Sequence, residues 1–337
     1  MTDRPDAPAR AIPAAPEPAG PERILPELTV IVISYNTAAL TLAALRTLYA
    51  ETTRTPFRCV LWDNASADGS AAAVAREFPQ VELVASTENL GFARANNVVA
   101  AQATTPWLLL LNPDTEVQDG AVDRLMDFAR GHPQGGIWGG RTVFRDGSLN
   151  IASCWGRITL WSTFCKTFGL GAAFPKSALF NPEAYGDWQR DTVREVDIVV
   201  GCFLLIRRDL WNELGGFDLK YHMYGEEADL CLRARERGWR PMITPEAQIM
   251  HIVGASTGDA PTRKALQVMR ARSTLVRDHW RPALVPLGLG LMWLGVALRY
   301  AATRPLALAP KAGLRAKAAR WAEIWQARRD WLAGYSA

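Results

Sequence analysis

The chain has 337 residues, of which 49% are hydrophobic and 21% charged, so it can bury a sizeable core and suits one large globular domain with an appendage. Its formal net charge is only +4, yet residues 299–330 hold eight basic and two acidic residues. Because the remainder is slightly negative, the charge pattern argues against a nucleic-acid-binding body and favours contact of this one segment with an anionic membrane surface.

The first residues do not look like part of a folded domain. Residues 1–26 are rich in proline and alanine and lack the continuous apolar run of a secretory signal, which predicts a disordered leader. Five scattered cysteines without Cys-x-x-Cys spacing favour a reducing, cytosolic compartment. The fold is expected to begin with an apolar, β-branched strand at Leu28–Ser34.

Strand and helix patterns then alternate along the chain. Further strands are expected at Arg58–Trp62, Val81–Val84 and Leu108–Leu111, and helices at Leu40–Tyr49 and Ala71–Phe78. This alternation predicts an α/β fold with a mostly parallel, doubly wound sheet. In such open sheets ligands bind at the carboxyl ends of the strands, so the polar residues that follow each strand are candidate site residues.

Polar motifs stand at these strand ends and before the following helix. In chain order they are Ser34-Tyr35-Asn36, Asp63-Asn64-Ala65-Ser66-Ala67-Asp68-Gly69-Ser70, Asn89-Leu90-Gly91-Phe92-Ala93-Arg94-Ala95-Asn96-Asn97 and Asn112-Pro113-Asp114. Any one of them alone is most often a turn or a helix cap. Together they predict one continuous polar crevice, in which Pro113 carries the Asp114 carboxylate past the sheet edge.

The second half of the chain is less regular. Residues 150–190 are rich in aromatic residues and suit either the core of a hydrophobic subdomain or a surface that faces the acceptor and lipid. Strand character resumes at Val196–Ile206, and a short strand at 248–250 precedes His251. A helix is expected to open at Glu226, where acids favour the helix dipole and Asp229 can pair with Arg233.

As an ordered set these motifs resemble family 2 of the glycosyltransferases, in particular its bacterial rhamnosyltransferase branch. The resemblance runs from about Leu28 to Thr257 and includes Gly215-Gly216-Phe217-Asp218 and Tyr224-Gly225-Glu226-Glu227-Ala228-Asp229-Leu230-Cys231-Leu232-Arg233. It implies a GT-A fold over residues 27–258, with a donor half at 27–142 and an acceptor half at 143–258. It also implies a nucleoside-diphosphate sugar donor, a divalent cation and inversion at the anomeric carbon.

The resemblance also implies roles for the residues of the donor half. Asp63 would accept the N3–H of a pyrimidine base. The other residues implied to contact the nucleotide are Ser34, Tyr35, Asn36, Asn89, Gly91, Phe92 and Asn96. Asp114 resembles the second aspartate of the Asp-x-Asp element that holds Mg²⁺ or Mn²⁺, while Asn112 replaces the first, and His251 resembles the family histidine near the diphosphate and metal. With one carboxylate, cation binding is expected to depend on the donor.

Inverting transfer needs a carboxylate that takes the proton of the acceptor hydroxyl. In the family pattern the base is the second acid of a Glu-Asp pair. Glu227 fills that position here and is the candidate base, while Glu226 and Asp229 remain alternatives.

Competing enzyme classes fit the sequence less well. An oxidoreductase would carry Gly-x-Gly-x-x-Gly after its first strand, and a processive synthase a Gln-x-x-Arg-Trp element. The sequence instead predicts a single-addition, inverting glycosyltransferase that uses dTDP-L-rhamnose or another dTDP- or UDP-sugar and a glycan or polyprenyl-diphosphate-linked acceptor. A UDP-sugar enzyme of another specificity and a noncatalytic sugar-nucleotide-binding relic remain open.

Residues 259–337 form an expected C-terminal helical segment. Ala283–Leu298 is uncharged, but it is short for a membrane span and is interrupted by Pro286 and three glycines. A basic helix with three tryptophans is expected over Lys311–Trp331, which is the composition of a helix that lies among lipid headgroups. This predicts peripheral attachment to the inner face of the cytoplasmic membrane. Packing on the catalytic domain or on a second subunit, as in a homodimer, is the alternative.

Overall fold

The computed structural model describes residues 25–252 and 261–336 of the chain. Apart from its last two residues, the leader expected over residues 1–26 lies outside the described residues. So does most of the motif Gly254-Ala255-Ser256-Thr257 at the end of the family resemblance, because residues 253–260 are not described.

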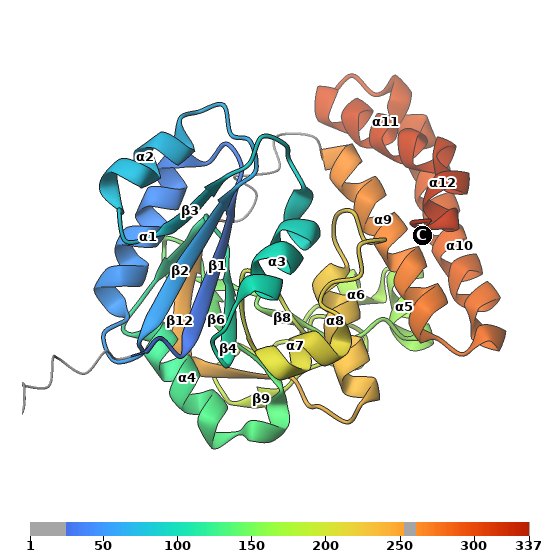
Figure 1. Cartoon of the computed structure of the whole chain (residues 1–337). Coiled ribbons are helices and arrows are strands. Elements are labelled where there is room, and N and C mark those ends of the chain that lie inside the picture. Colours follow the sequence, from blue (N-terminus) through green and yellow to red (C-terminus); the bar gives the residue numbers. More distant parts are fainter. Residues whose placement is uncertain (1–24, 253–260, 337) are drawn as a thin grey trace, which may run out of the picture.

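A ten-stranded sheet forms the centre of the described molecule, and helices cover both of its faces (Figure 1). Its main path has the order β3-β2-β1-β4-β11-β6-β12-β5. These strands are β1 (Leu28–Ser34), β2 (Phe57–Asp63), β3 (Glu82–Ala85), β4 (Trp107–Leu111), β5 (Thr115–Val117), β6 (Ile137–Val143), β11 (Phe203–Arg207) and β12 (Met242–His251). Two short strands, β7 (Leu149–Asn150) and β9 (Arg194–Glu195), pair with β6 and β12, and β8 (Cys154–Trp155) pairs with β10 (Ile198–Val199) in a separate sheet.

Strand β1 shows why the central strands are continuous apolar runs. Successive strand residues point to opposite faces of a sheet, so a strand that is covered on both faces needs apolar residues throughout. Leu28, Val30 and Val32 belong to one core, and Ile31 and Ile33 belong to the other. The first core is shared with α1 (Ala38–Glu51), α2 (Ser70–Glu77) and α4 (Ala121–Gly131), and the second with α3 (Gly91–Gln102), α7 (Arg208–Leu214) and α8 (Glu226–Glu236).

The predicted fold class, a mostly parallel central sheet flanked by helices with a C-terminal helical appendage, is confirmed. β1 runs parallel to β2 and β4, and β12 runs parallel to β6, whereas β11 and β5 oppose their neighbours. The prediction of one strand over Val196–Ile206 is wrong, because a turn from Val200 to Phe203 separates β10 from β11. The short strand expected at 248–250 is the end of the longer β12.

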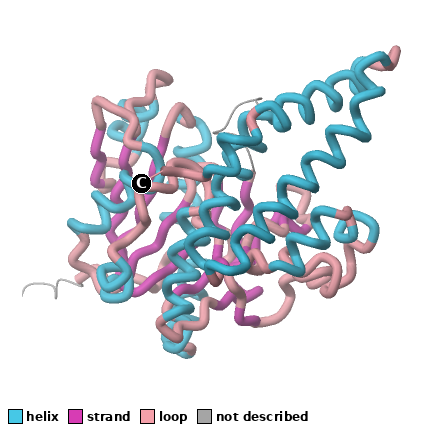
Figure 2. The backbone as a smooth tube through the Cα atoms, turned by 90° about the vertical axis from the view of Figure 1, so that its right-hand side faces the viewer, coloured by secondary structure: helices cyan, strands magenta, loops and turns pink. Residues whose placement is uncertain are grey.

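The later helices lie together along one flank of the molecule (Figure 2). They are α9 (Pro261–His279), α10 (Val285–Thr303), α11 (Ala312–Gln326) and α12 (Arg328–Ala333), and α10 packs on α5 (Leu160–Thr167), which precedes the short α6 (Leu170–Ala173). The single basic helix expected over Lys311–Trp331 is interrupted at Ala327. This interruption returns Trp331 to the core, where its side chain is fully buried and its indole N–H donates to the Ile324 carbonyl at 2.9 Å. Trp331 is therefore not a lipid-facing residue.

The pairing of β6 with β12 can be tested by its effect on stability. β12 is irregular between Thr244 and Gln248, and a Cβ added to Gly140 would lie 2.0 Å from the Ala247 carbonyl oxygen. We expect Gly140→Ala to lower the free energy of unfolding by about 1–3 kcal/mol, because backbone must shift to admit the methyl group. Gly131→Ala is the control, since nothing lies within 4 Å of a Cβ there. Denaturant midpoints at equal m-value would measure both, and equal midpoints would contradict the prediction.

Candidate active site

The polar strand ends lie on one edge of the sheet. Because β1 pairs in parallel with both β2 and β4, their carboxyl ends are neighbours, and Ser34 lies opposite Asp63 in register. The Asn112 N–H donates to the Cys202 carbonyl at 3.0 Å, which places the segment before β11 at the same edge. His251 at the end of β12 lies opposite Thr115, the residue after Asp114.

Much of the first two motifs is used to build the loops. The Asn36 N–H donates to Ser66 Oγ at 2.8 Å, and the Asn36 side-chain oxygen accepts the Ala67 N–H at 2.8 Å. Asp68 accepts the Ala38 N–H at the start of α1 at 2.8 Å. Asn36 has a φ of 51°, a backbone conformation that asparagine tolerates better than most residues. The Asn36 oxygen is therefore engaged, and its amide N–H groups are what it can offer a nucleoside.

The remaining predicted nucleotide contacts divide into structural and accessible groups. Ser34 is fully buried, with its hydroxyl within hydrogen-bond distance of Thr37 and Thr41, whereas Tyr35 is 44% exposed. Asn89 accepts the Gly91 N–H at 2.9 Å, and the fully buried Asn96 donates to the Phe92 carbonyl at 2.9 Å. Ser34 thus supports its loop from inside, whereas Asn96 also has a buried Oδ1 without a hydrogen-bond partner among the described residues.

Asn64, which sequence reasoning did not single out, joins the second loop to the third. Its side-chain oxygen accepts the Leu90 N–H at 3.1 Å, and its amide donates to the Gly91 carbonyl at 3.4 Å. Asp63 and the start of α3 are therefore held beside each other. The signal in the sequence was the position of Asn64 directly after the candidate base-reading carboxylate.

Asp63 itself has an unsatisfied oxygen. The residue is 2% exposed, and its Oδ2 accepts the Ser66 N–H at 2.9 Å. Its Oδ1 is buried and has no hydrogen-bond partner among the residues that the structure describes. Leaving such an acceptor unpaired costs about 1–3 kcal/mol, so the atom is well suited to accept a ligand N–H.

Asp114 and His251 form a second buried pair. Asp114 is 4% exposed, and its Oδ1 lies 3.4 Å from His251 Nε2. Burial opposes protonation of the imidazole, but Cys202 and Asp114 outweigh it and raise the pKa of His251 to about 10. His251 Nδ1 has no hydrogen-bond partner within the described ranges. The Asp114 carboxylate can hold a divalent cation, and the imidazole can join it once the cation displaces the ring proton, although the described residues include no cluster of three or more protein ligands.

The start of α8 adjoins the donor half through Gly201. A Cβ built on Gly201 would lie 3.3 Å from the Phe92 ring and 3.9 Å from Glu227 Cβ. Gly201 is followed by Cys202, which accepts the Asn112 N–H. Contacts therefore lead from Asp63 through the start of α3 to Glu227, and from there to Asn112 and Asp114.

The two glutamates at the start of α8 have perturbed pKa values. Burial raises the pKa of Glu227, and burial together with the neighbouring Glu227 raises the pKa of Glu226 well above its usual range. Glu226 is 6% exposed and its Oε2 lacks a described partner, while Glu227 is partly exposed. Glu227 thus combines access with a pKa shifted toward neutrality, which suits a general base.

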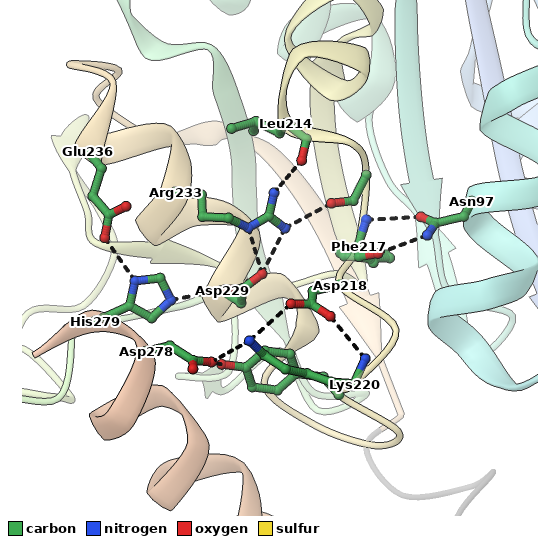
Figure 3. A network of polar contacts seen from close by, with 12 residues as sticks. Asn97, Leu214, Phe217, Asp218, Lys220, Asp229, Arg233, Glu236, Asp278 and His279 are labelled. Carbon is green, nitrogen blue, oxygen red and sulfur yellow. Dashed lines mark hydrogen bonds and ion pairs between the residues drawn. The ribbon is translucent and has the colours of Figure 1, made fainter. Parts of the chain in front are cut away.

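Asp229 is held in a polar network (Figure 3). Its Oδ2 accepts from Arg233 Nε at 2.7 Å, and its Oδ1 lies 3.0 Å from His279 Nε2. Arg233 also donates to the Leu214 and Gly216 carbonyls, at 2.6 and 2.8 Å. Since both Asp229 oxygens are occupied, the contacts favour Glu227 over Asp229 as the base.

The same network includes two residues that sequence reasoning missed. Asn97 of α3 makes two hydrogen bonds with the Phe217 backbone, at 2.8 and 2.9 Å, and His279 bridges Asp229 and Glu236 from α9. Asn97 stood inside a recognised motif. His279 lies 50 residues from Asp229, and no local pattern indicates the contact.

Comparison with known proteins identifies relatives of this chain. A family model described as glycosyl transferase family 2 matches residues 29–215. The N-acetylglucosaminyl-diphospho-decaprenol L-rhamnosyltransferase of Mycobacterium tuberculosis is 31% identical over 223 residues, which cover 62% of this chain and 71% of that protein. The rhamnosyltransferase WbbL of Escherichia coli is 29% identical over 174 residues, covering 48% of this chain and 60% of WbbL.

Among solved structures, the mannosyltransferase PcManGT from Pyrobaculum calidifontis, in complex with GDP-Man and Mn²⁺, resembles this chain with a TM-score of 0.53 and 20% identity. The match covers 92% of this chain and 84% of PcManGT. At this identity the likeness shows a shared fold.

The Asp229–His279 contact predicts a pH-dependent contribution to stability. Burial disfavours the imidazolium, but hydrogen bonds to Asp229 and Glu236 outweigh it and raise the pKa of His279. A raised folded-state pKa stabilises the protein below the unfolded value of about 6.5, and this stabilisation is lost as pH rises through the folded-state pKa. We expect His279→Ala to lower the free energy of unfolding by about 1.5–3 kcal/mol at pH 6 and by less at higher pH. His222→Ala, at an exposed histidine, is the control, and a pH-independent deficit in His279→Ala would contradict the prediction.

Proposed function

Because this chain belongs to glycosyl transferase family 2, it is a glycosyltransferase, and we propose that it transfers L-rhamnose, with inversion, from a nucleoside-diphosphate sugar to a glycan or lipid-linked acceptor. The observation that carries the proposal is a chain of neighbouring residues at one sheet edge. It leads from Asp63 through Asn64 and the start of α3 to Gly201, which adjoins both Glu227 at the start of α8 and the Asn112–Asp114 loop. The two rhamnosyltransferases among the relatives support rhamnose as the sugar and, in one case, a polyprenyl-diphosphate acceptor.

The donor half would recognise the nucleotide. Uracil and thymine both present an N3–H, and the free Oδ1 of Asp63 would accept it. The amide of Asn36, the exposed Tyr35 and the loop that contains Asn89, Gly91 and Phe92 would surround the nucleoside. Since Asp63 reads an edge common to both bases, it selects a pyrimidine nucleotide and not the sugar.

Asp114 and His251 would hold the divalent cation, with Asn112 as a neutral oxygen donor nearby. The remaining ligands would come from the diphosphate and from water, as is usual for magnesium. When bound, the cation would neutralise negative charge on the departing nucleoside diphosphate. Because the protein supplies few ligands, it should bind the cation only weakly when no nucleotide sugar is present.

Glu227 would act as the general base. As the acceptor hydroxyl oxygen bonds to C1 of the sugar, its proton passes to the Glu227 carboxylate, and the bond from C1 to the diphosphate oxygen breaks on the opposite face. The raised pKa of Glu227 makes the carboxylate a better proton acceptor. Glu226, more deeply buried, would hold the backbone of this helix start.

The proposed domain division also concerns the C-terminal segment. We propose a donor half at 27–142, an acceptor half at 143–258 and a helical segment at 259–337 that contacts the inner face of the cytoplasmic membrane peripherally. This segment is bound tightly to the catalytic part, because the Tyr335 hydroxyl donates to the Met223 carbonyl at 2.5 Å and His279 contacts Asp229. The C-terminal segment therefore contacts both the loop before α8 and α8 itself.

A donor screen tests the function directly. Purified protein with a lipid-linked acceptor and Mg²⁺ or Mn²⁺ should release nucleotide fastest from dTDP-L-rhamnose, among dTDP-, UDP- and GDP-sugars, and chelation of the cation should abolish release. Faster release from a UDP-sugar would identify another specificity. Donor binding without turnover for any sugar would identify a noncatalytic relic and end the proposal.

Glu227→Gln tests the base. We expect kcat to fall about a thousandfold, while the calorimetric Kd for the donor changes less than about twofold, because the amide cannot accept the proton. In the unchanged enzyme, kcat should fall as pH drops through the Glu227 pKa, at a pH above the value of about 4.3 for an ordinary glutamate. Glu226→Gln and Asp229→Asn are the comparison variants. If one of these variants lost turnover while Glu227→Gln kept it, the residue changed in that variant would be the general base instead.

A further inference from the structure

Helix α10 presents an uncovered apolar face. The segment Pro282–Leu308 is long and apolar enough to cross a membrane, yet only 22% of its most apolar window is buried. Leu287 and Leu298 are 53% and 44% exposed, and Gly290, Leu294 and Ala301 lie between or beyond them at helical spacing on the same face. Soluble helices normally bury such a stripe, so this face needs a partner.

A second apolar surface lies on α5. Trp161, Phe164 and Phe168 are 42%, 38% and 48% exposed, and they follow one another at helical spacing. Their rings pack in series, with centroids 5.5 Å apart for Trp161 and Phe164 and 4.7 Å apart for Phe164 and Phe168. We call Trp161-Phe164-Phe168 the aromatic ridge. Its rings are exposed, whereas Trp155 and Trp188 pack against buried clusters, so residues 150–190 contribute to both core and surface.

Helix α5, which carries most of the ridge, packs directly on α10. Thr167 of α5 donates to the Leu291 carbonyl at 2.9 Å, and Arg299 of α10 donates to the Thr167 carbonyl at 3.1 Å. By helical geometry Leu291 and Arg299 flank one side of the exposed stripe. On the other side, Trp293 packs on Trp325 of α11, with centroids 5.5 Å apart.

Positive charge borders this apolar surface. On the side of α5 away from the ridge, a cavity of about 220 Å³ between α5, α6 and α10 is lined by Lys166 and Arg299 together with Ser162, Asn181 and Glu183. Glu183 pairs with Arg272 at 2.6 Å and with Lys166 at 3.8 Å, so one carboxylate faces three cations, counting Arg299, and positive charge remains in excess. Exposed Arg315, Lys317 and Arg320 on α11 extend this charge along the neighbouring helix.

We propose that the aromatic ridge, the apolar face of α10 and the cations on the other side of α5 and on α11 dock together on an anionic lipid bilayer, with a lipid phosphate in the cavity beside Lys166. Aromatic and aliphatic side chains beside basic residues are the composition that binds the headgroup layer. A second copy of the chain is a poorer occupant, because it would bring the same positive charges together.

This docking surface rests on the proposed function, and it adds the route by which a lipid-linked acceptor would reach the site. Arg272, which pairs with Glu183 of the cavity wall, follows Ala271, and Ala271 lies next to Gly225 before α8. One helix, α9, therefore separates the lipid-phosphate cavity from the residues next to Glu227. A lipid-linked acceptor held in the bilayer would enter the site from this side.

Vesicle flotation of the full chain tests the surface. Phe164→Ser/Phe168→Ser and Leu287→Gln/Leu298→Gln should each lower the partition coefficient at least about tenfold on vesicles of phosphatidylglycerol and phosphatidylcholine. Lys166→Gln should lower the partition coefficient about fivefold on these vesicles and leave binding to pure phosphatidylcholine vesicles unchanged. The controls lie in the β6–β7 turn and should bind like the unchanged protein. They are Phe144→Ser, at a residue whose 42% exposure lies between those of Phe164 and Phe168, and Arg145→Gln, at a side chain more exposed than that of Lys166.

The outcomes separate this surface from the proposed function. Unaltered flotation of both apolar double variants, with unfolding temperatures like that of the unchanged protein, would overturn the surface. Conversion of a dimer to monomers by either double variant, without loss of flotation, would assign the surface to a second copy and also overturn it. With a water-soluble acceptor, the rate of nucleotide release in every variant should stay within about twofold of the rate in the unchanged protein. If the unchanged protein floats but transfers no sugar, the proposed function fails and the surface stands.

Discussion

The geometry of the site depends on the parallel pairing of β1 with β2 on one side and β4 on the other. Parallel pairing aligns carboxyl ends, so three loops that are distant in the sequence emerge side by side. It also requires both faces of β1 to be covered, which the two cores accomplish with alternate residues. The buried sheet thus supplies a rigid edge, and the polar loops can leave oxygens of Asp63 and Asp114 without described hydrogen-bond partners.

The fold and the donor half could be predicted from the sequence because their signals are local. Apolar runs such as Leu108–Leu111 and the polar residues that follow them indicate both a strand and its end. The structure also shows what these patterns leave out, since the Ser34 hydroxyl is buried against Thr37 and Thr41 although its motif suggested contact with a ligand. A motif records that a position matters, and it does not distinguish a residue that binds from one that holds the loop.

The acceptor half could be predicted less well because its determinants are distant contacts. The division of Val196–Ile206 into two strands depends on a turn whose residues are as apolar as the strands they separate. The return of Trp331 to a core depends on helices packed from three parts of the chain. His279 is the clearest case, because an isolated histidine in a helix gives no sign that it meets Asp229 and Glu236.

The hydrogen bond from Tyr335 to the Met223 carbonyl spans 112 positions of the chain. During synthesis, amino-terminal regions fold first. The loop before Glu226 therefore receives this support only after Tyr335 has left the ribosome, when the sheet and the donor half can already have formed. A nascent chain would thus complete the sheet edge that carries Asp63 and Asp114 before the helix start that carries Glu227 receives this contact.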